Sequence, residues 1–98
     1  MAPRLEIEVK YYAILREASG KKREVIRLPE RSSVRDLMDV VVGRYGERFR
    51  SYVYDVEDRV RDYLAFMLNG VNVHAMEGFD TPLRDGDVMA ILPPVGGG

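Results

Sequence analysis

A short run of apolar residues near the end of the chain constrains the fold most. Residues Val88 to Leu92 are all apolar, so a strand made from them has no polar face to turn toward water. Such a strand is favoured where it has a neighbour on each side. Pro93 and Pro94 follow it and lack the backbone N–H groups that a sheet requires. The run therefore predicts a central strand that ends at Leu92.

Two segments near the start have the pattern of a strand pair. From Leu5 to Tyr11, apolar residues occupy every second position, which is the period of a strand with one buried face. Residues 19–22, Ser-Gly-Lys-Lys, interrupt this pattern. Residues 24–28 then resume an extended, β-branched run that stops at Pro29. We therefore expect these two strands to form a hairpin.

One segment has the period of an amphipathic helix. Ser33 and Asp36 stand three positions apart and nearly match a capping box, which predicts a helix that begins at Val34. Apolar residues then recur at intervals of three and four until Gly46, which is placed to end the helix. Residues 47–62 are harder to interpret, because a weak amphipathic pattern lies there among many charges.

The remaining segments complete one sheet. Residues 65–68 are expected to form a short strand, and a second one is expected at residues 71–74. Asn69-Gly70 between them is a favoured hairpin dipeptide, because both residues tolerate positive φ. The polar turn at residues 83–87 delivers the chain into the final apolar strand.

The order of these elements indicates a fold. A hairpin, a helix and short strands ending in a buried strand enclose one core only if the helix packs across a mixed sheet. We predict an α+β fold of the β-grasp, ubiquitin-like type, with four to five strands and one main helix. With 98 residues in total, the chain is predicted to form one domain over residues 1–92 and a flexible tail over residues 93–98.

Composition excludes most familiar kinds of site. The chain has no cysteine, which removes disulfides and thiolate chemistry, and its single histidine, His74, cannot form a histidine cluster. The 15 Lys and Arg residues nearly balance the 16 Asp and Glu residues, so no net field draws the chain to nucleic acid or a membrane. No apolar run has the length of a membrane span. We expect a cytoplasmic protein that binds no metal, nucleic acid or membrane.

The last six residues form the one segment that a stable fold does not require. Pro93 and Pro94 stiffen its root, and residues 96–98 are glycines, so the segment could extend about 20 Å. Glycine could thread a partner's narrow channel without a Cβ clash, and the end presents a bare carboxylate. The alternative is a frayed terminus or an expression remnant. A tail without a role, however, gains nothing from a stiff root.

Three segments match the motifs of a known family. They are Val9-Lys10-Tyr11-Tyr12-Ala13-Ile14-Leu15-Arg16-Glu17, Thr81-Pro82-Leu83-Arg84-Asp85-Gly86-Asp87 and Leu92-Pro93-Pro94-Val95-Gly96-Gly97-Gly98. They resemble the molybdopterin synthase small subunit family of ubiquitin-like sulfur carriers, which usually has Phe where Tyr11 and Tyr12 stand. The resemblance covers both ends and most of the chain between them. Residues 46–62 carry no family motif and are interpreted as a lineage-specific insertion.

The resemblance implies a carrier that is not an enzyme by itself and binds no cofactor. An E1-like adenylating enzyme would use ATP to adenylate Gly98, and the adenylate would be converted to a thiocarboxylate. The large subunit of molybdopterin synthase, in a heterotetramer, would receive the tail and transfer the sulfur to a cyclic pyranopterin phosphate, building the dithiolene of molybdopterin. The tail residues that would accompany Gly98 are Pro93, Pro94, Val95, Gly96 and Gly97.

The same resemblance assigns three residues to the contact with the partner. Tyr12, Val73 and Leu92 match family positions whose side chains touch it. Ordinary core packing is an equally open role for each of the three.

Other functions remain open at this point. A protein modifier would join Gly98 to lysines of other proteins, as ubiquitin does. A sulfur carrier for thiazole or tRNA thiolation would use the same terminus. A plain interaction module with an incidental tail would lose no activity if Gly97 and Gly98 were deleted.

Overall fold

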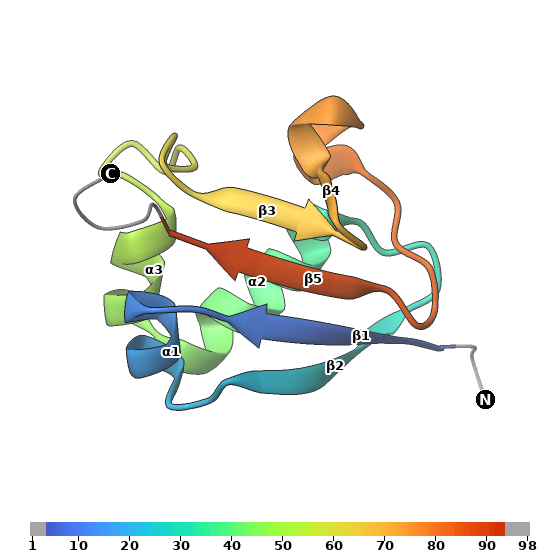
Figure 1. Ribbon diagram of the computed structural model, residues 1–98, viewed down its shortest axis with the longest axis horizontal. Coiled ribbons are helices and arrows are strands. Elements are labelled where there is room, and N and C mark those ends of the chain that lie inside the picture. The colour runs from blue at the N-terminus through green and yellow to red at the C-terminus, as the bar shows by residue number, and fades with distance from the viewer. Residues whose placement is uncertain (1–3, 94–98) are drawn as a thin grey trace.

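A computed structural model describes residues 4–93 of the chain and confirms the β-grasp arrangement (Figure 1). A five-stranded mixed sheet packs against helices. The strands are β1 Arg4–Tyr11, β2 Arg23–Pro29, β3 Ala65–Leu68, β4 Val71–Asn72 and β5 Val88–Leu92. The helices are α1 Ile14–Ser19, α2 Val34–Tyr45 and α3 Glu47–Val53, and two 3-10 turns, η1 Val73–Ala75 and η2 Gly78–Asp80, follow β4.

The apolar strand β5 occupies the centre of the sheet, as predicted from its composition. The strand order is β2-β1-β5-β3-β4. β5 runs parallel to β1, with Ile91 beside Tyr11, and antiparallel to β3, with Leu92 beside Ala65. β1 and β2 form the predicted antiparallel pair. Because β1 and β3 do not pair with each other, β5 alone joins the two halves of the sheet.

The core lies between α2 and one face of the sheet. Figure 1 shows α2 behind the strands. The alternating residues of β1 and β5 that face the helix are buried, as is the apolar stripe of α2. These residues are Leu5, Ile7, Val9, Tyr11, Met89 and Ile91 from the strands, and Val34, Leu37, Met38, Val41 and Val42 from the helix.

Both ends of α2 form as predicted. The Asp36 carboxylate accepts a hydrogen bond from the Ser33 backbone N–H at 2.8 Å, and the Ser33 hydroxyl accepts one from the Asp36 N–H at 3.4 Å, which completes a capping box. Gly46 ends the helix with a φ of 80°, a conformation that favours glycine. These caps fix where the helix enters and leaves the core.

The connecting segments differ from the sequence predictions in two places, and a third segment, which the sequence left open, is resolved. The link between β1 and β2 contains the helix α1, which the sequence pattern did not reveal. The strand predicted at residues 71–74 is wrong beyond Asn72, because the Asn72 side chain accepts a hydrogen bond from the His74 N–H and caps a 3-10 turn. Residues 47–62 are described throughout: they form α3 and then a loop closed by a bridge between Tyr54 and Val60.

Ala13 has a backbone conformation that normally requires glycine. It precedes α1 with φ 53° and ψ −125°. This strain costs about 1–3 kcal/mol. We expect Ala13→Gly to raise the free energy of unfolding by about 1 kcal/mol, because the relief of strain exceeds the added entropy of the unfolded glycine. Chemical denaturation would measure it.

The matched control for this prediction is Ala18→Gly, since Ala18 lies inside α1. A glycine there is expected to lower the free energy of unfolding by about 1 kcal/mol. Equal losses for the two variants would contradict the strain at Ala13.

Candidate functional site at the root of the tail

The tail leaves the folded body at the end of the central strand. Leu92 is the last residue of β5, and Pro93 follows it, half-buried. The end of β1 and the start of β3 lie on either side, because Tyr11 pairs with Ile91 and Ala65 with Leu92. Pro94, Val95, Gly96, Gly97 and Gly98 lie outside the described residues, so their predicted roles stay predictions.

The tail root is continuous with an apolar strip on the sheet face opposite α2. On β5, Met89 and Ile91 are buried toward the core, whereas Val88, Ala90 and Leu92 point to the other face and are half-buried. β3 adds two further half-buried apolar residues to this face, Ala65 and Met67. The strip therefore leads directly to the point where the tail begins.

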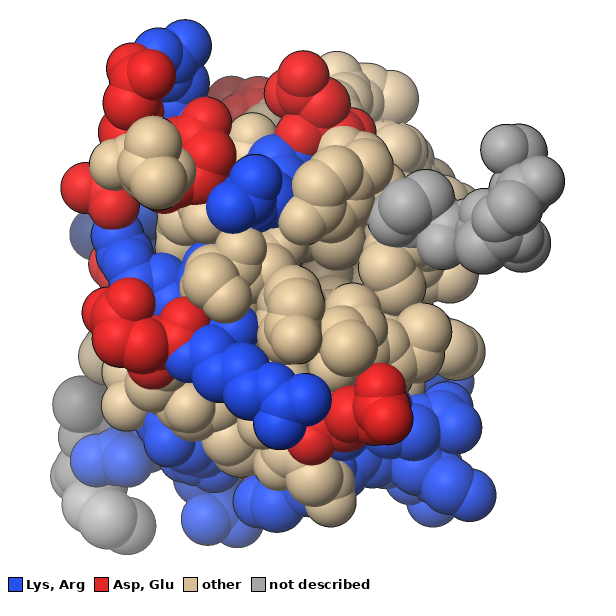
Figure 2. Space-filling view, turned by 90° about the vertical axis from the view of Figure 1, so that its left-hand side faces the viewer, with Lys and Arg blue, Asp and Glu red and all other residues tan. Residues whose placement is uncertain are grey.

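Tyr12 lies at the same end of the sheet as Leu92. It follows the last residue of β1, and the Arg16 guanidinium stacks over its ring at 5.8 Å. The structure thus brings two of the predicted partner-contact residues, Tyr12 and Leu92, to the root of the tail. Figure 2 views this end of the molecule: uncharged residues occupy its centre, and Lys, Arg, Asp and Glu side chains lie above, to the left of and below them.

Val73, the third residue predicted to touch a partner, lies elsewhere. It begins η1 and is only 1% exposed within the hydrophobic core. This burial favours core packing for Val73, and its contact with a partner stays a prediction.

Sequence patterns did not single out Glu24, whose carboxylate accepts a hydrogen bond from the Tyr11 hydroxyl. Glu24 lies on β2 opposite Val9 and points toward the helices, with its side chain 7% exposed. It accepts hydrogen bonds from the Tyr11 hydroxyl at 2.6 Å, from the Tyr45 hydroxyl, and from Arg44 Nη1 at 2.9 Å. A buried charge with this many donors is stabilised where an isolated one would not be.

Aromatic rings extend this cluster from the sheet to both helices. The Tyr11 ring makes edge-to-face contacts with Tyr45 at 5.9 Å and Phe49 at 5.7 Å between centroids. Tyr45 belongs to α2 and Phe49 to α3. Hydrogen bonds to Glu24 therefore connect β1, β2 and α2 close to the tail root. The contact of Phe49 with the Tyr11 ring connects α3 to the same cluster.

The hydrogen bonds of the cluster shift the pKa values of its members. Burial raises the pKa of Glu24, but hydrogen bonds from Tyr11, Tyr45 and Lys21 lower it by more, so the pKa lies below its usual 4.5. Burial, followed by the hydrogen bond to Glu24, raises the pKa of Tyr11 far above 10. The pKa of Tyr45 is raised for the same reasons. Near neutral pH the cluster therefore contains the ionised carboxylate of Glu24, which accepts hydrogen bonds from two neutral phenols and from the cations Lys21 and Arg44.

Neither a metal centre nor a membrane span is found in the part of the chain that the structure describes. Residues 4–93 contain no group of three or more histidine or acidic residues placed to hold a metal ion. No helix among them is long and apolar enough to cross a bilayer.

Comparison with known proteins gives a family match along nearly the whole chain. The sequence model of the ThiS family matches residues 9–98. This range contains the end of β1 and the whole of β3, which flank the tail root, and the tail itself.

Individual relatives carry two kinds of name. The chain is 30% identical to small archaeal modifier protein 3 of Haloferax volcanii, over 96% of this chain and all of that protein. It is 29% identical to the molybdopterin synthase sulfur carrier subunit of Drosophila erecta, over 98% of this chain and 94% of that protein. The crystal structure of SAMP1 from Haloferax volcanii superposes with a TM-score of 0.84 at 26% identity, covering 95% of this chain and 99% of that one.

Proposed function

The chain belongs to the ThiS family of ubiquitin-like sulfur carriers, and from this premise we propose that it is the sulfur-carrying small subunit of a molybdopterin synthase. Carriers of this family are non-catalytic small proteins that act with partner proteins such as E1-like activating enzymes. In the proposed reaction Gly98 is the site of adenylation and thiocarboxylation. The large synthase subunit receives the tail and supplies the catalytic residues.

The chemistry explains why this chain needs no catalytic side chain. A carboxylate is a poor electrophile, and ATP activates it by forming an acyl-adenylate with release of pyrophosphate. A sulfur nucleophile then attacks the acyl carbon and AMP leaves, which gives the thiocarboxylate at Gly98. The absence of cysteine from the sequence suits this task, because a nearby thiolate could attack the activated terminus.

The observation that carries the proposal is the junction of the glycine tail with the central strand. Pro93 follows Leu92 directly, so the tail starts from the central strand, which has a neighbour on each side. In the proposed role the two prolines of the sequence stiffen the start of the tail, and the glycines after them can thread a partner's channel. The half-buried residues Tyr12 and Leu92 stand at this root, where a partner that receives the tail must approach.

The test has two stages. The chain is first incubated with the E1-like adenylating enzyme of its source, ATP and a sulfur donor, and mass spectrometry should detect the exchange of one terminal oxygen for sulfur. The thiocarboxylated chain is then mixed with the large synthase subunit and the cyclic pyranopterin phosphate, and molybdopterin should form. A thiocarboxylated chain that yields no molybdopterin would count against this function.

A second candidate function is protein modification, and one observation favours it: the 30% identity to small archaeal modifier protein 3. A modifier would join Gly98 to lysine side chains through an isopeptide bond. Expression of a tagged chain in its source organism would then give conjugates that carry glycine remnants on lysine. Conjugates in a strain with an intact molybdopterin pathway would support both roles, since each uses the same adenylate.

A further inference from the structure

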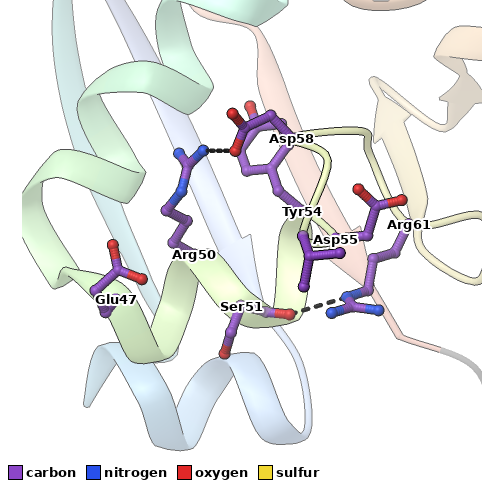
Figure 3. A pocket seen from close by; sticks show the side chains of 8 residues that line it. Glu47, Arg50, Ser51, Tyr54, Asp55, Asp58 and Arg61 are labelled. Carbon is purple, nitrogen blue, oxygen red and sulfur yellow. Dashed lines mark hydrogen bonds and ion pairs between the residues drawn. The ribbon is translucent and has the colours of Figure 1, made fainter.

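Acidic neighbours offset the cationic residues of the chain in some places but not along β2. In a hollow of about 290 Å³ between α3 and the loop that follows it, Arg50 pairs with Asp58 (Figure 3). Residues 21–27, by contrast, read Lys-Lys-Arg-Glu-Val-Ile-Arg, with four cations and one acid. The acid is Glu24, which points inward toward the helices. The segment is therefore locally basic, although the whole chain has a net charge of −1.

This basic segment lies on an edge strand of the sheet. The strand order places β2 at one end, next to β1 alone. In Figure 1 β2 is the lowest strand and no described element lies below it, and Lys and Arg side chains predominate along the lower margin of Figure 2. The other edge strand, β4, has only two residues, whereas β2 has seven. Within residues 4–93, β2 therefore provides the longer open edge.

The hydrogen bonds of β1 show which backbone groups of β2 point outward. Glu8 lies opposite Val25, but its N–H donates to the Asp87 carbonyl at 3.0 Å, on the other side of β1. Val25 and Glu8 are thus a pair that exchanges no backbone hydrogen bond. Because such pairs alternate with bonded ones along an antiparallel ladder, the N–H and C=O groups of Arg23, Val25 and Arg27 all point away from β1.

The side chains of the same three residues lie together on the sheet face opposite α2. Val25 is 54% exposed, between the two arginines. Arg23 lies 3.6 Å from the Glu8 carboxylate and Arg27 lies 3.0 Å from the Glu6 carboxylate, and the two arginine side chains are 72% and 67% exposed. A guanidinium has five N–H donors, so each can bind a second carboxylate. The edge therefore offers an apolar contact between two groups that bind anions.

A second copy of the chain fits this edge poorly. Antiparallel pairing of two β2 strands about Val25 would put Arg23 of each copy opposite Arg27 of the other, and like charges directly opposite are destabilising. Charged residues of this kind commonly protect an edge strand from self-association. Protection alone, however, does not require an exposed valine between them. The combination favours a partner strand of opposite charge.

We propose that the outer edge of β2 binds an extended acidic segment of a partner protein, which adds a strand to the sheet. An apolar residue of the segment lies opposite Val25, and acidic residues two positions to either side lie opposite Arg23 and Arg27. The outward backbone groups bind the segment, and the alternate side chains select it. A peptide is favoured over nucleic acid, whose backbone lacks the N–H and C=O groups that would pair with this edge. β1 separates this site from β5, which bears the tail.

The probe is a capped peptide with the core Glu-Thr-Val-Thr-Glu, which reads the same in both directions and so fits either strand orientation. It is titrated into the isotope-labelled chain and followed by NMR. The amide signals of residues 23–27 should shift, and hydrogen exchange of the Val25 and Arg27 N–H groups should slow, because these groups bond to the peptide only if it pairs as a strand. The matched peptide Lys-Thr-Val-Thr-Lys should not bind.

Variants test the two parts of the recognition separately. Reversing both charges, with Arg23→Glu and Arg27→Glu, is expected to weaken binding of the acidic peptide at least about tenfold and to allow binding of the lysine peptide. Arg48→Glu, an exposed charge reversal on α3, is the matched control and should change neither affinity. Val25→Pro removes an outward N–H but no bond to β1, and should also weaken binding about tenfold.

Three results would overturn the proposal. Binding that leaves exchange of the outward N–H groups unchanged would mean charge attraction alone. An oligothymidylate that causes the same shifts and the same slowed exchange would identify nucleic acid as the ligand. Slowed exchange at high protein concentration without peptide, together with a dimer in sedimentation, would identify a second copy. None of these measurements involves adenylation, so the outcome is independent of the proposed function.

Discussion

Replacing Glu24 by alanine is expected to lower the free energy of unfolding by about 2–4 kcal/mol. The loss arises because the hydroxyls of Tyr11 and Tyr45 would keep their burial but lose their acceptor. For a domain of this size it corresponds to a decrease in Tm on the order of 10 °C, measurable by differential scanning calorimetry. Glu24→Gln retains an acceptor without the charge and should lose less.

The control for Glu24 is a carboxylate in an exposed ion pair. Glu6 accepts a hydrogen bond from Arg27 at 3.0 Å, and both side chains are well exposed, so Glu6→Ala should change the free energy of unfolding by less than about 1 kcal/mol.

The contribution of Glu24 to the free energy of unfolding depends on pH, in a direction that follows from its pKa shift. Because the pKa of Glu24 is lower in the folded chain, its stabilisation is present above pH 4.5 and is lost as the pH falls through the folded pKa.

At alkaline pH the free energy of unfolding changes with pH in the opposite direction, because of Tyr11. Its pKa is raised on folding, so above the unfolded value of 10 the unfolded chain releases the phenol proton while the folded chain keeps it. Stability therefore decreases as the pH rises above 10. A Glu24→Ala variant with the wild-type stability, and with the same acid dependence, would show that the buried carboxylate contributes nothing.

Deleting Gly97 and Gly98 is expected to abolish thiocarboxylate formation altogether. The proposed acyl group is then absent, and the new end at Gly96 stops short of the adenylation site. The deleted residues follow the tail root, so the unfolding temperature should equal that of the wild-type chain. Mass spectrometry after incubation with the adenylating enzyme, ATP and a sulfur donor measures the product, and calorimetry confirms the fold.

Single substitutions in the tail sharpen this prediction. Gly97→Ala places a Cβ beside the reacting carboxyl group and should reduce the rate roughly tenfold to a hundredfold, because small displacements at a reacting centre have large effects. Gly96→Ala is the matched control, since its Cβ lies one residue further from the reacting carboxyl group, and it should retain most activity. A shortened chain that still acquires sulfur would mean that the charged group lies elsewhere.

Sequence patterns predicted the elements whose determinants are local. Ser33 and Asp36 specify the start of α2 within four residues, and Gly46 specifies its end. The uniform apolar character of Val88–Leu92 predicted a central strand, because such a strand requires neighbours on both sides. The end of the central strand at Leu92, where the tail begins, was predicted from the two prolines that follow it.

The features that the sequence did not reveal depend on distant segments or on very short elements. The alternation of Glu24 with Ile26 and Leu28 places it on the buried face of β2. Its partners could not be predicted, because the hydroxyls that donate to its carboxylate come from Tyr11 and Tyr45, on other elements. α1 has only six residues, too few for a helical period to appear. Val73 continued an apparent strand, but the capping side chain of Asn72 turned the backbone into a 3-10 turn.

The central position of β5 also determines when the complete sheet can form during synthesis of the chain. The pairs β2-β1 and β3-β4 are each made of segments synthesised early, but neither pair contacts the other within the sheet. They can be joined only after residues 88–92 have left the ribosome. A chain truncated before that point lacks the strand that closes the sheet. Chains that end before β5 are therefore expected to remain unfolded, which exposes them to cellular proteases.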